Sequence, residues 1–567
     1  MLTSTIRFIL LYIMAALVGT TSAHAQTPVQ IISDNFTLSG EIEGAAGIDI
    51  ISELERFRSA LLEVHDLPAN QPERRLDIYV VTDPEIFEIL GVDESFVAVY
   101  APTSAGPRAL INGSLPEMTT TPGSALRRSL RHEYAHHFIY THLPIAQPRW
   151  LSEGLAEFYA GYEELPDGSY QIGTPDQQSK LILSYPVTGW TDMRGILRSH
   201  QKINSRPSRS FNRPPEGWVR RPDNISFFYA QTWGLVHWAI NRTEDTNISA
   251  AHETLGGLAE KLIGMESYLT RGEDILTPPS LKVWQESNLA LDEITEGIAL
   301  EALGLPLQGP EKGAETSGTL EEAISTHVAG PANVITRQPR AGRITSSVEI
   351  TNLSATESAA VQYRNMSLTA GSSALINPRM QSLKAEIETD PDFATSLLVS
   401  QAALQYAVGG TQTAINFISE AKAKGGQDKD LEALSLEIDF GDFLNRNFMN
   451  PELMRGKIQT ALSKYPNDPQ LLGMMATTGM GDARNGQTFA PDVQAALDKM
   501  VALEIPKREP VKALPLVNLY LQMEDYQSAL DLLYRAEPFI DAGNSYTLRN
   551  SIDEIQRVVK EQQSNTP

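Results

Sequence analysis

Residues 131–136 read Arg-His-Glu-Tyr-Ala-His and residues 150–157 read Trp-Leu-Ser-Glu-Gly-Leu-Ala-Glu, and these two stretches decide what the chain can be. On a helix, His132 and His136 lie one turn apart on one face, so both imidazoles can bind a single cation. Glu133 points to the flank, where a water bound to that cation would lie. The pattern His-Glu-x-x-His therefore predicts a zinc site with its own general base, an arrangement typical of hydrolases.

The third zinc ligand must come from elsewhere, because an open catalytic site has three protein ligands and a water. One candidate is His142, which has the spacing of the pattern His-Glu-x-x-His-x-x-Gly-x-x-His. That pattern needs a glycine at a sharp turn, where this chain has Ile139, a β-branched residue that resists positive φ. Without the turn the helix continues and carries His142 about 120° away from the face of His136.

A second helix supplies the favoured candidate. Pro144 and Pro148 end the first helix, and a new helix begins at Trp150, so the site is built from two helices. Glu153 lies on the second helix, and Glu157 follows it one turn later on the same face, where it can accept a hydrogen bond from a ligating imidazole. The expected site is one Zn²⁺ ion bound by His132, His136 and Glu153.

This arrangement resembles the gluzincin metallopeptidases, the thermolysin-like group of the peptidase MA clan. In that group a second helix brings a glutamate ligand, followed four residues later by an acidic residue behind the ligands. Residues 150–157 look like the Trp-x-x-Glu-Gly-x-Ala-Glu form of the bacterial exported branch, with Glu157 in place of thermolysin's aspartate. The likeness is specific over about residues 125–160, looser over 30–125 and 225–240, and does not reach the C-terminal part.

The resemblance implies further roles. It implies a zincin-like fold, and a strand whose edge binds the substrate backbone, matched here by residues 109–112. It also implies a Tyr or His that hydrogen-bonds the tetrahedral oxyanion, for which Tyr229 and His237 are the candidates. Their spacing of eight keeps them within about 80° on one helix. His137, which points about 100° away from His136, is expected to be structural.

The chain divides by composition and periodicity into four segments. Residues 1–25 have the charge, apolar stretch and small-x-small end of an export signal. Residues 26–303 are expected to form the α+β zincin-like catalytic domain, and residues 304–375 a linker or uncertain segment in which 344–361 predicts a strand or two. Residues 376–567 predict a mainly α domain of helical hairpins, tetratricopeptide-like, since Ala461 and Ala529 are two loose periods of about 34 residues apart.

Composition narrows the partners and the compartment. The formal charge of −24 argues against a nucleic-acid partner, because phosphate binding needs a dense positive surface. A local basic stretch at 202–221 is interpreted as a solvated loop or as a lid facing the substrate. The chain has no cysteine, so its export serves no disulfide framework and favours a bacterial periplasmic or extracellular protein. No membrane span is expected after the signal is cleaved.

Two functions follow as expectations. The first is an exported zinc metallopeptidase that hydrolyses peptide bonds through a metal-activated water, with Glu133 as general base, acting on a peptide or protein substrate. The alternative is a binding or scaffold protein, in which the helical repeats hold a protein partner and the zinc domain is structural or inactive. A zinc hydrolase acting on something other than a peptide stays open, because the residues that wall a specificity pocket are not readable from one sequence.

Overall fold

A computed structural model describes most of the 567-residue chain. The described residues are 27–85, 89, 97–103, 105–116, 118–143, 148–198, 224–241, 248–271, 291–303, 319–330, 334–339, 347–369, 374, 377–425, 428, 430–480, 488–508, 510–537 and 550–558. The expected export signal, the basic stretch 202–221 and the Gly/Pro-rich stretch 304–318 lie outside these ranges.

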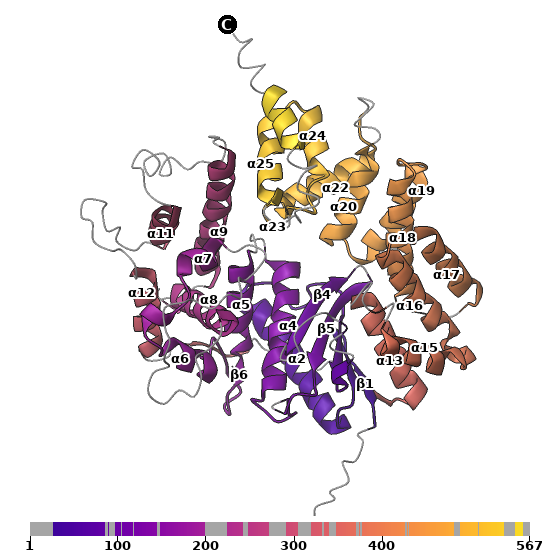
Figure 1. Cartoon of the computed structure of the whole chain (residues 1–567), viewed down its shortest axis with the longest axis horizontal. Helices are drawn as coiled ribbons and strands as arrows, with labels where there is room; N and C mark the ends of the chain where they lie inside the picture. Colours follow the sequence, from indigo (N-terminus) through magenta and orange to yellow (C-terminus); the bar gives the residue numbers. More distant parts are fainter. Residues whose placement is uncertain are drawn as a thin grey trace, which may run out of the picture.

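A six-stranded mixed sheet lies on the side of the first half that faces the helical second half (Figure 1). Its strands are β1 Val29–Ile32, β2 Phe36–Gly40, β3 Leu76–Val81, β4 Ala98–Thr103, β5 Gly106–Asn112 and β9 Glu349–Asn352. Their order is β4-β5-β3-β2-β1-β9, in which β2, β3 and β5 are parallel and the other three strands run antiparallel to their neighbours. A smaller sheet joins β6 Glu163–Glu164, β7 Tyr170–Ile172 and β8 Ile335–Arg337.

Helices make up most of the remaining described residues. In the first part they are α2 Gly44–Val64, α4 Ala125–His142, α5 Arg149–Ala160, α6 Gln177–Leu183, α7 Met193–Arg198, α8 Asn224–Asn241, α9 Ile248–Arg271, α11 Leu291–Ala302 and α12 Thr319–Ala329. The later helices are α13 Ala355–Thr369, α15 Pro378–Glu388, α16 Ala394–Ala407, α17 Thr411–Ala423, α18 Leu431–Asn445, α19 Pro451–Lys464, α20 Pro469–Thr478, α22 Pro491–Ala502, α23 Ile505–Arg508, α24 Leu516–Gln522 and α25 Tyr526–Ala536. Within the described ranges, no helix is both long enough and apolar enough to span a bilayer. The architecture is α+β with a helical C-terminal half.

Strand β3 shows why the sheet is covered on both faces. It is an almost continuous apolar run, which is typical of a strand buried on both sides. Ile78 and Val80 pack into the core that α2 and α4 share, whereas Tyr79 and Val81 pack with apolar residues of α13, α15 and α16. The second face of the sheet is therefore covered by helices that follow residue 354.

The segment 304–375 does more than connect the two halves. Its described residues supply β8 to the small sheet, β9 to the edge of the large sheet beside β1, and α12, which packs against α8. The expectation of strands over 344–361 is correct only for β9, because α13 already begins at Ala355. The Ser354 hydroxyl accepts from Glu357 N (3.2 Å) while Ser354 N donates to the Glu357 carboxylate (2.6 Å). This capping box starts the helix and overrides the β-branched residues that follow.

The helices after α13 pack mostly against their neighbours in sequence. In Figure 1 they follow an arc from α13, beside the sheet, through α19 to α24 and α25. The far end of the arc returns to the first half, where α25 packs against α9 and the Arg535 guanidinium lies 3.4 Å from the Glu260 carboxylate. The helical half thus contacts the α+β half near both of its ends.

Candidate metal centre

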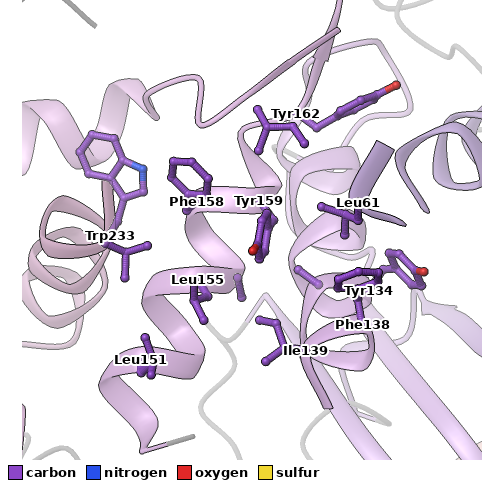
Figure 2. Close-up of a cluster of buried hydrophobic side chains, with 14 of the residues drawn as sticks. Leu61, Tyr134, Phe138, Ile139, Leu151, Leu155, Phe158, Tyr159, Tyr162 and Trp233 are labelled. Carbon is purple, nitrogen blue, oxygen red and sulfur yellow. The ribbon is translucent and has the colours of Figure 1, made fainter. Parts of the chain in front are cut away.

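Helices α4 and α5 place the two motif stretches against each other. The Ser124 hydroxyl accepts from Arg127 N (3.4 Å) at the start of α4, and Pro148 precedes the first turn of α5. The helices share a buried cluster to which Phe138 and Ile139 contribute from α4 and Leu155 from α5 (Figure 2). Burial of these side chains, each worth about 2 kcal/mol, fixes the two helices side by side.

A glycine lets a third helix approach the same place. A Cβ atom on Gly154 would lie 2.6 Å from the Thr232 carbonyl oxygen of α8, closer than real contacts allow. The absence of a side chain at Gly154 therefore permits α8 to press against α5 next to Glu153. As a result Tyr229 of α8 lies over the site, with its ring centroid 6.2 Å from that of His132.

His132, His136 and Glu153 converge in the structure as the sequence predicts. The two Nε2 atoms lie 3.1 Å apart, and Glu153 Oε2 lies 3.3 Å from each of them. Ligand atoms placed tetrahedrally at the usual 2.0–2.1 Å from a zinc ion are separated by about 3.3 Å. The three atoms therefore have the spacing of three ligands around one metal ion, and this group could hold one.

The carboxylate of Glu153 is ionised, as a metal ligand would need to be. Its Oε2 atom is buried and has no hydrogen-bond partner in the described part of the chain. Burial raises the pKa of Glu153, but the His136 and His132 imidazoles lower it well below the ordinary range, so the group is ionised at neutral pH. The three side chains keep 11–14 % of their surface exposed, so the group is not fully enclosed.

Polar groups behind the ligands hold the imidazole rings. Nδ1 of His132 lies 3.0 Å from Glu157 Oε1, the role predicted for Glu157, and the Arg128 guanidinium donates to Glu157 Oε2 (2.7 Å). Nδ1 of His136 lies 3.1 Å from Ser152 Oγ. Such partners orient a ligating histidine and fix its tautomer. The sequence analysis did not predict these roles for Arg128 and Ser152. Arg128 could have been predicted, because it lies one turn before His132 on the same face of the helix.

Glu133 lies beside the ligands on α4 and is buried. Burial raises the pKa of its carboxyl, the neighbouring His132 and His136 imidazoles lower it, and the net shift is upward. Burial and the Glu153 carboxylate also raise the pKa of Tyr229, so its phenol stays protonated and can donate a hydrogen bond at neutral pH. The Tyr229 phenol is therefore protonated at neutral pH, as an oxyanion donor must be. Glu133 can act as a general base only when ionised, the form that the His132 and His136 imidazoles favour and burial opposes.

His237 is not brought to this group, which corrects its assignment as an oxyanion partner. Its Nε2 atom lies 3.1 Å from the Gly173 carbonyl oxygen, to which it donates, and its Nδ1 atom lies 2.7 Å from His327 Nε2. Its ring packs against Phe158 and Trp233 in the core. Both nitrogens are engaged there, and two further turns of α8 separate His237 from Tyr229.

The two remaining histidines of α4 face away from the metal group. Nε2 of His142 donates to Glu73 (2.7 Å), and both side chains are fully buried, so His142 is not the third ligand. Nε2 of His137 donates to the Arg74 carbonyl (3.1 Å), which leaves Nδ1 to accept from the Tyr100 hydroxyl (3.2 Å). His137 is structural, as expected, because it fastens α4 to the loop before β3 and to β4.

The buried Glu73 carboxylate pairs with His142 of α4 and with Arg58 of α2. Glu73→Gln is expected to lower the free energy of unfolding by about 3 kcal/mol. Burial raises the pKa of Glu73, but His142, His137 and Arg58 lower it from 4.5 to about 2. A depressed pKa stabilises the fold above the unfolded value and loses that effect as the pH falls toward 2. The gap between the urea-unfolding curves of parent and variant should be widest above about pH 5 and close toward pH 2.

The exposed Glu386 of α15 provides the matched control for this substitution. Glu386→Gln should unfold like the parent at every pH, because its carboxylate is already in water. A Glu73→Gln variant as stable as the parent at neutral pH would show that the buried network does not hold α4.

The edge strand next to the metal group is β4. The expectation that residues 109–112 form this edge strand is therefore wrong. Residues 109–112 belong to β5, which is flanked by β4 on one side and β3 on the other. β4 is the terminal strand, and Tyr100 from it stacks on His136 with ring centroids 6.4 Å apart and planes 22° from parallel. Strand order depends on pairing between distant segments, so position along the chain was a poor guide to it.

Comparison with known proteins adds no family: neither the protein-family models nor the curated proteins match this chain. The assignment of function therefore depends on the geometry of the site.

Proposed function

We propose that the protein is a zinc metallopeptidase of the gluzincin type, which hydrolyses peptide bonds in an open site made by α4, α5 and α8. Support comes from the spacing of the ligand atoms of His132, His136 and Glu153, which lie 3.1–3.3 Å from one another. Three protein ligands with an open side are the pattern of a catalytic zinc, whereas structural zinc sites use four. This spacing is the single observation that carries the proposal.

The donor set of two imidazoles and one carboxylate fits zinc. The buried Glu153 Oε2 without a hydrogen-bond partner is the atom that such an ion would satisfy. When bound, zinc supplies Lewis-acid activation of a water and of the scissile carbonyl. The Glu133 carboxylate accepts a proton from the attacking water, whose oxygen bonds to the carbonyl carbon, and delivers that proton to the amine as the C–N bond breaks. The Tyr229 hydroxyl donates to the oxyanion that forms.

Metal analysis combined with proteolysis tests the proposal. Purified protein should contain about one zinc ion per chain and cleave casein or a peptide library. A chelator should abolish cleavage, and added zinc should restore it. Full zinc occupancy with no cleavage of either substrate would contradict the proposal and favour a scaffold with a structural metal domain.

Tyr229→Phe is expected to lower kcat by about 100-fold, because removing one oxyanion donor typically costs that much. KM and zinc content should change little, since the ring and its packing remain. Steady-state kinetics on one peptide, with zinc measured in the same preparation, checks this. Tyr520→Phe on α24 is the matched control and should match the parent. An unchanged kcat in Tyr229→Phe would remove Tyr229 from the mechanism.

The proposal extends to location and partners. Residues 1–25 direct export to a bacterial periplasm or the outside of the cell, and the helical C-terminal half is a tetratricopeptide-like region that binds a protein. Pulse labelling of the precursor and sequencing of the mature N-terminus test the first point. A mature chain that still begins at Met1 would contradict it.

A further inference from the structure

A cavity of about 190 Å³ lies between the α+β half and the helical half. One wall comes from the second half of α4 and from β4, with Tyr100, Pro102 and Tyr140. The opposite wall comes from the loop between α19 and α20, with Tyr465, and from the first turn of α20, with Gln470. Each wall belongs to a different half of the chain, so the cavity exists only because the helical arc returns to this place.

An ion pair and a stacked ring hold the second wall in position. The Arg74 guanidinium lies 2.9 Å from Asp468 and 5.2 Å from the centre of the Tyr465 ring. The backbone carbonyl of Arg74 is the same group that accepts from His137 of α4. The loop between α19 and α20 is thus fixed to the segment that also anchors the motif helix.

The cavity borders the metal group through one residue. Tyr100 lines the cavity and stacks on the ligand His136. The two side chains at positions 100 and 102 of β4 point to the same face, because side chains alternate along a strand. A polypeptide lying along β4 beside the metal group would therefore direct a side chain toward the cavity.

The backbone of β4 suits such a polypeptide. Asn112 N donates to Val97 O (2.8 Å), so this pair is hydrogen-bonded, and the ladder bonds of β4 recur at every second residue from there. Residues 98, 100 and 102 consequently turn their backbone groups toward the outer edge. Pro102 fits this position because its missing N–H is not needed by β5.

The lining favours an aromatic side chain. Tyrosine rings and prolines form much of it, and four of its ionisable residues are paired with one another, Glu73 with His142 and Arg74 with Asp468. Apolar cavities of about 150 Å³ bind benzene, so this volume accepts one aromatic ring. Peptide recognition along a strand edge typically combines backbone hydrogen bonds with pockets for alternate side chains.

We propose that this cavity is a substrate subsite for an aromatic side chain, and that the helical half determines specificity by supplying Tyr465 and Gln470 to it. The proposal rests on the proposed peptidase function for the nature of the ligand, a polypeptide. In this proposal the helical half contributes directly to substrate selection. This role is separate from the binding of a partner protein on its outer surface.

Peptide binding to the full chain carrying Glu133→Gln tests the subsite without cleavage of the probe. The probes are fluorescein-labelled Ala/Ser peptides that differ only in a central Phe or Ala, followed by fluorescence anisotropy. The Phe peptide should bind at least about tenfold more tightly than the Ala peptide, as expected for burying one aromatic ring. Gln470→Trp should fill the cavity. The affinity for the Phe peptide should then fall to the affinity for the Ala peptide.

A control variant separates the subsite from general damage. Gln412→Trp, on the exposed face of α17 and away from the cavity, should leave the preference for the Phe peptide unchanged. Equal binding of the two peptides, a preference that survives Gln470→Trp, or no binding of either peptide would each overturn the subsite. Failure of the parent chain to cleave any peptide would instead overturn the proposed peptidase, while the binding preference would still report on the cavity.

Discussion

Glu133→Gln is expected to leave zinc bound and to lower turnover by at least about 100-fold. The amide of Gln has nearly the shape of the carboxylate but cannot accept a proton from water or pass one to the leaving amine. Glu133 is buried on α4 between the two ligand histidines, so the substitution stays within the same packed volume. Loss of a general base costs typically 100- to 10,000-fold in rate. Single-turnover cleavage of a quenched-fluorescent peptide measures the effect.

Zinc content measured on the same preparation makes the result interpretable. Since Glu133 is not among the ligand atoms that converge, occupancy should equal that of the parent. Turnover within a few fold of the parent would contradict the role of Glu133 and, with it, the proposed mechanism. Reduced occupancy would mean that the substitution disturbs the metal group itself.

The site was predictable from sequence where it depends on local geometry. The four-residue spacing of His132 and His136 defines one helical face, and the prolines at 144 and 148 define two helices. Glu153 then follows, because it is the acidic residue of the second helix with Glu157 one turn behind it. His142 was the less favoured candidate for a local reason too, the β-branched Ile139, and the structure pairs it with Glu73.

Features that depend on distant pairing were harder to predict. His237 and Tyr229 share a helix, and only the contact of α8 with α5 around Gly154 decides which of them meets His132. The identity of the edge strand required the order β4-β5-β3, which no local pattern contains. The start of α13 at Ala355 is different, since Ser354 and Glu357 carried a capping-box signal that was missed.

The helical half also covers part of the core of the first half, although composition suggested a separate domain. The apolar run of β3 was the available signal, because a strand apolar on both sides needs covering on both sides. The predicted elements before residue 303 cover one face with α2 and α4. Tyr363 and Met366 of α13 complete the other face with Tyr79 and Val81. The helices after residue 354 therefore stabilise the sheet that supports the metal group.

Glu153→Ala is expected to weaken zinc binding by more than about 100-fold and to abolish cleavage. Changes to groups behind the ligands already cost 10- to 100-fold in metal affinity, so removal of a ligand should cost more. Glu153 is the only ligand contributed by α5, and its Oε2 atom lies 3.3 Å from both imidazole Nε2 atoms. Without it, two imidazoles on one helix remain. Competition with a chromophoric chelator measures the affinity.

The fold should survive this substitution, because the contact between α4 and α5 depends on apolar residues such as Phe138 and Leu155 rather than on the metal group. Urea unfolding of the zinc-free parent and the zinc-free variant should therefore be similar, which separates loss of a ligand from loss of structure. Glu386→Ala, on the exposed face of α15, should bind zinc like the parent. If Glu153→Ala retains full zinc affinity, the carboxylate is not a ligand. Two imidazoles alone would then not account for an open three-ligand site, and the peptidase proposal would lose its basis.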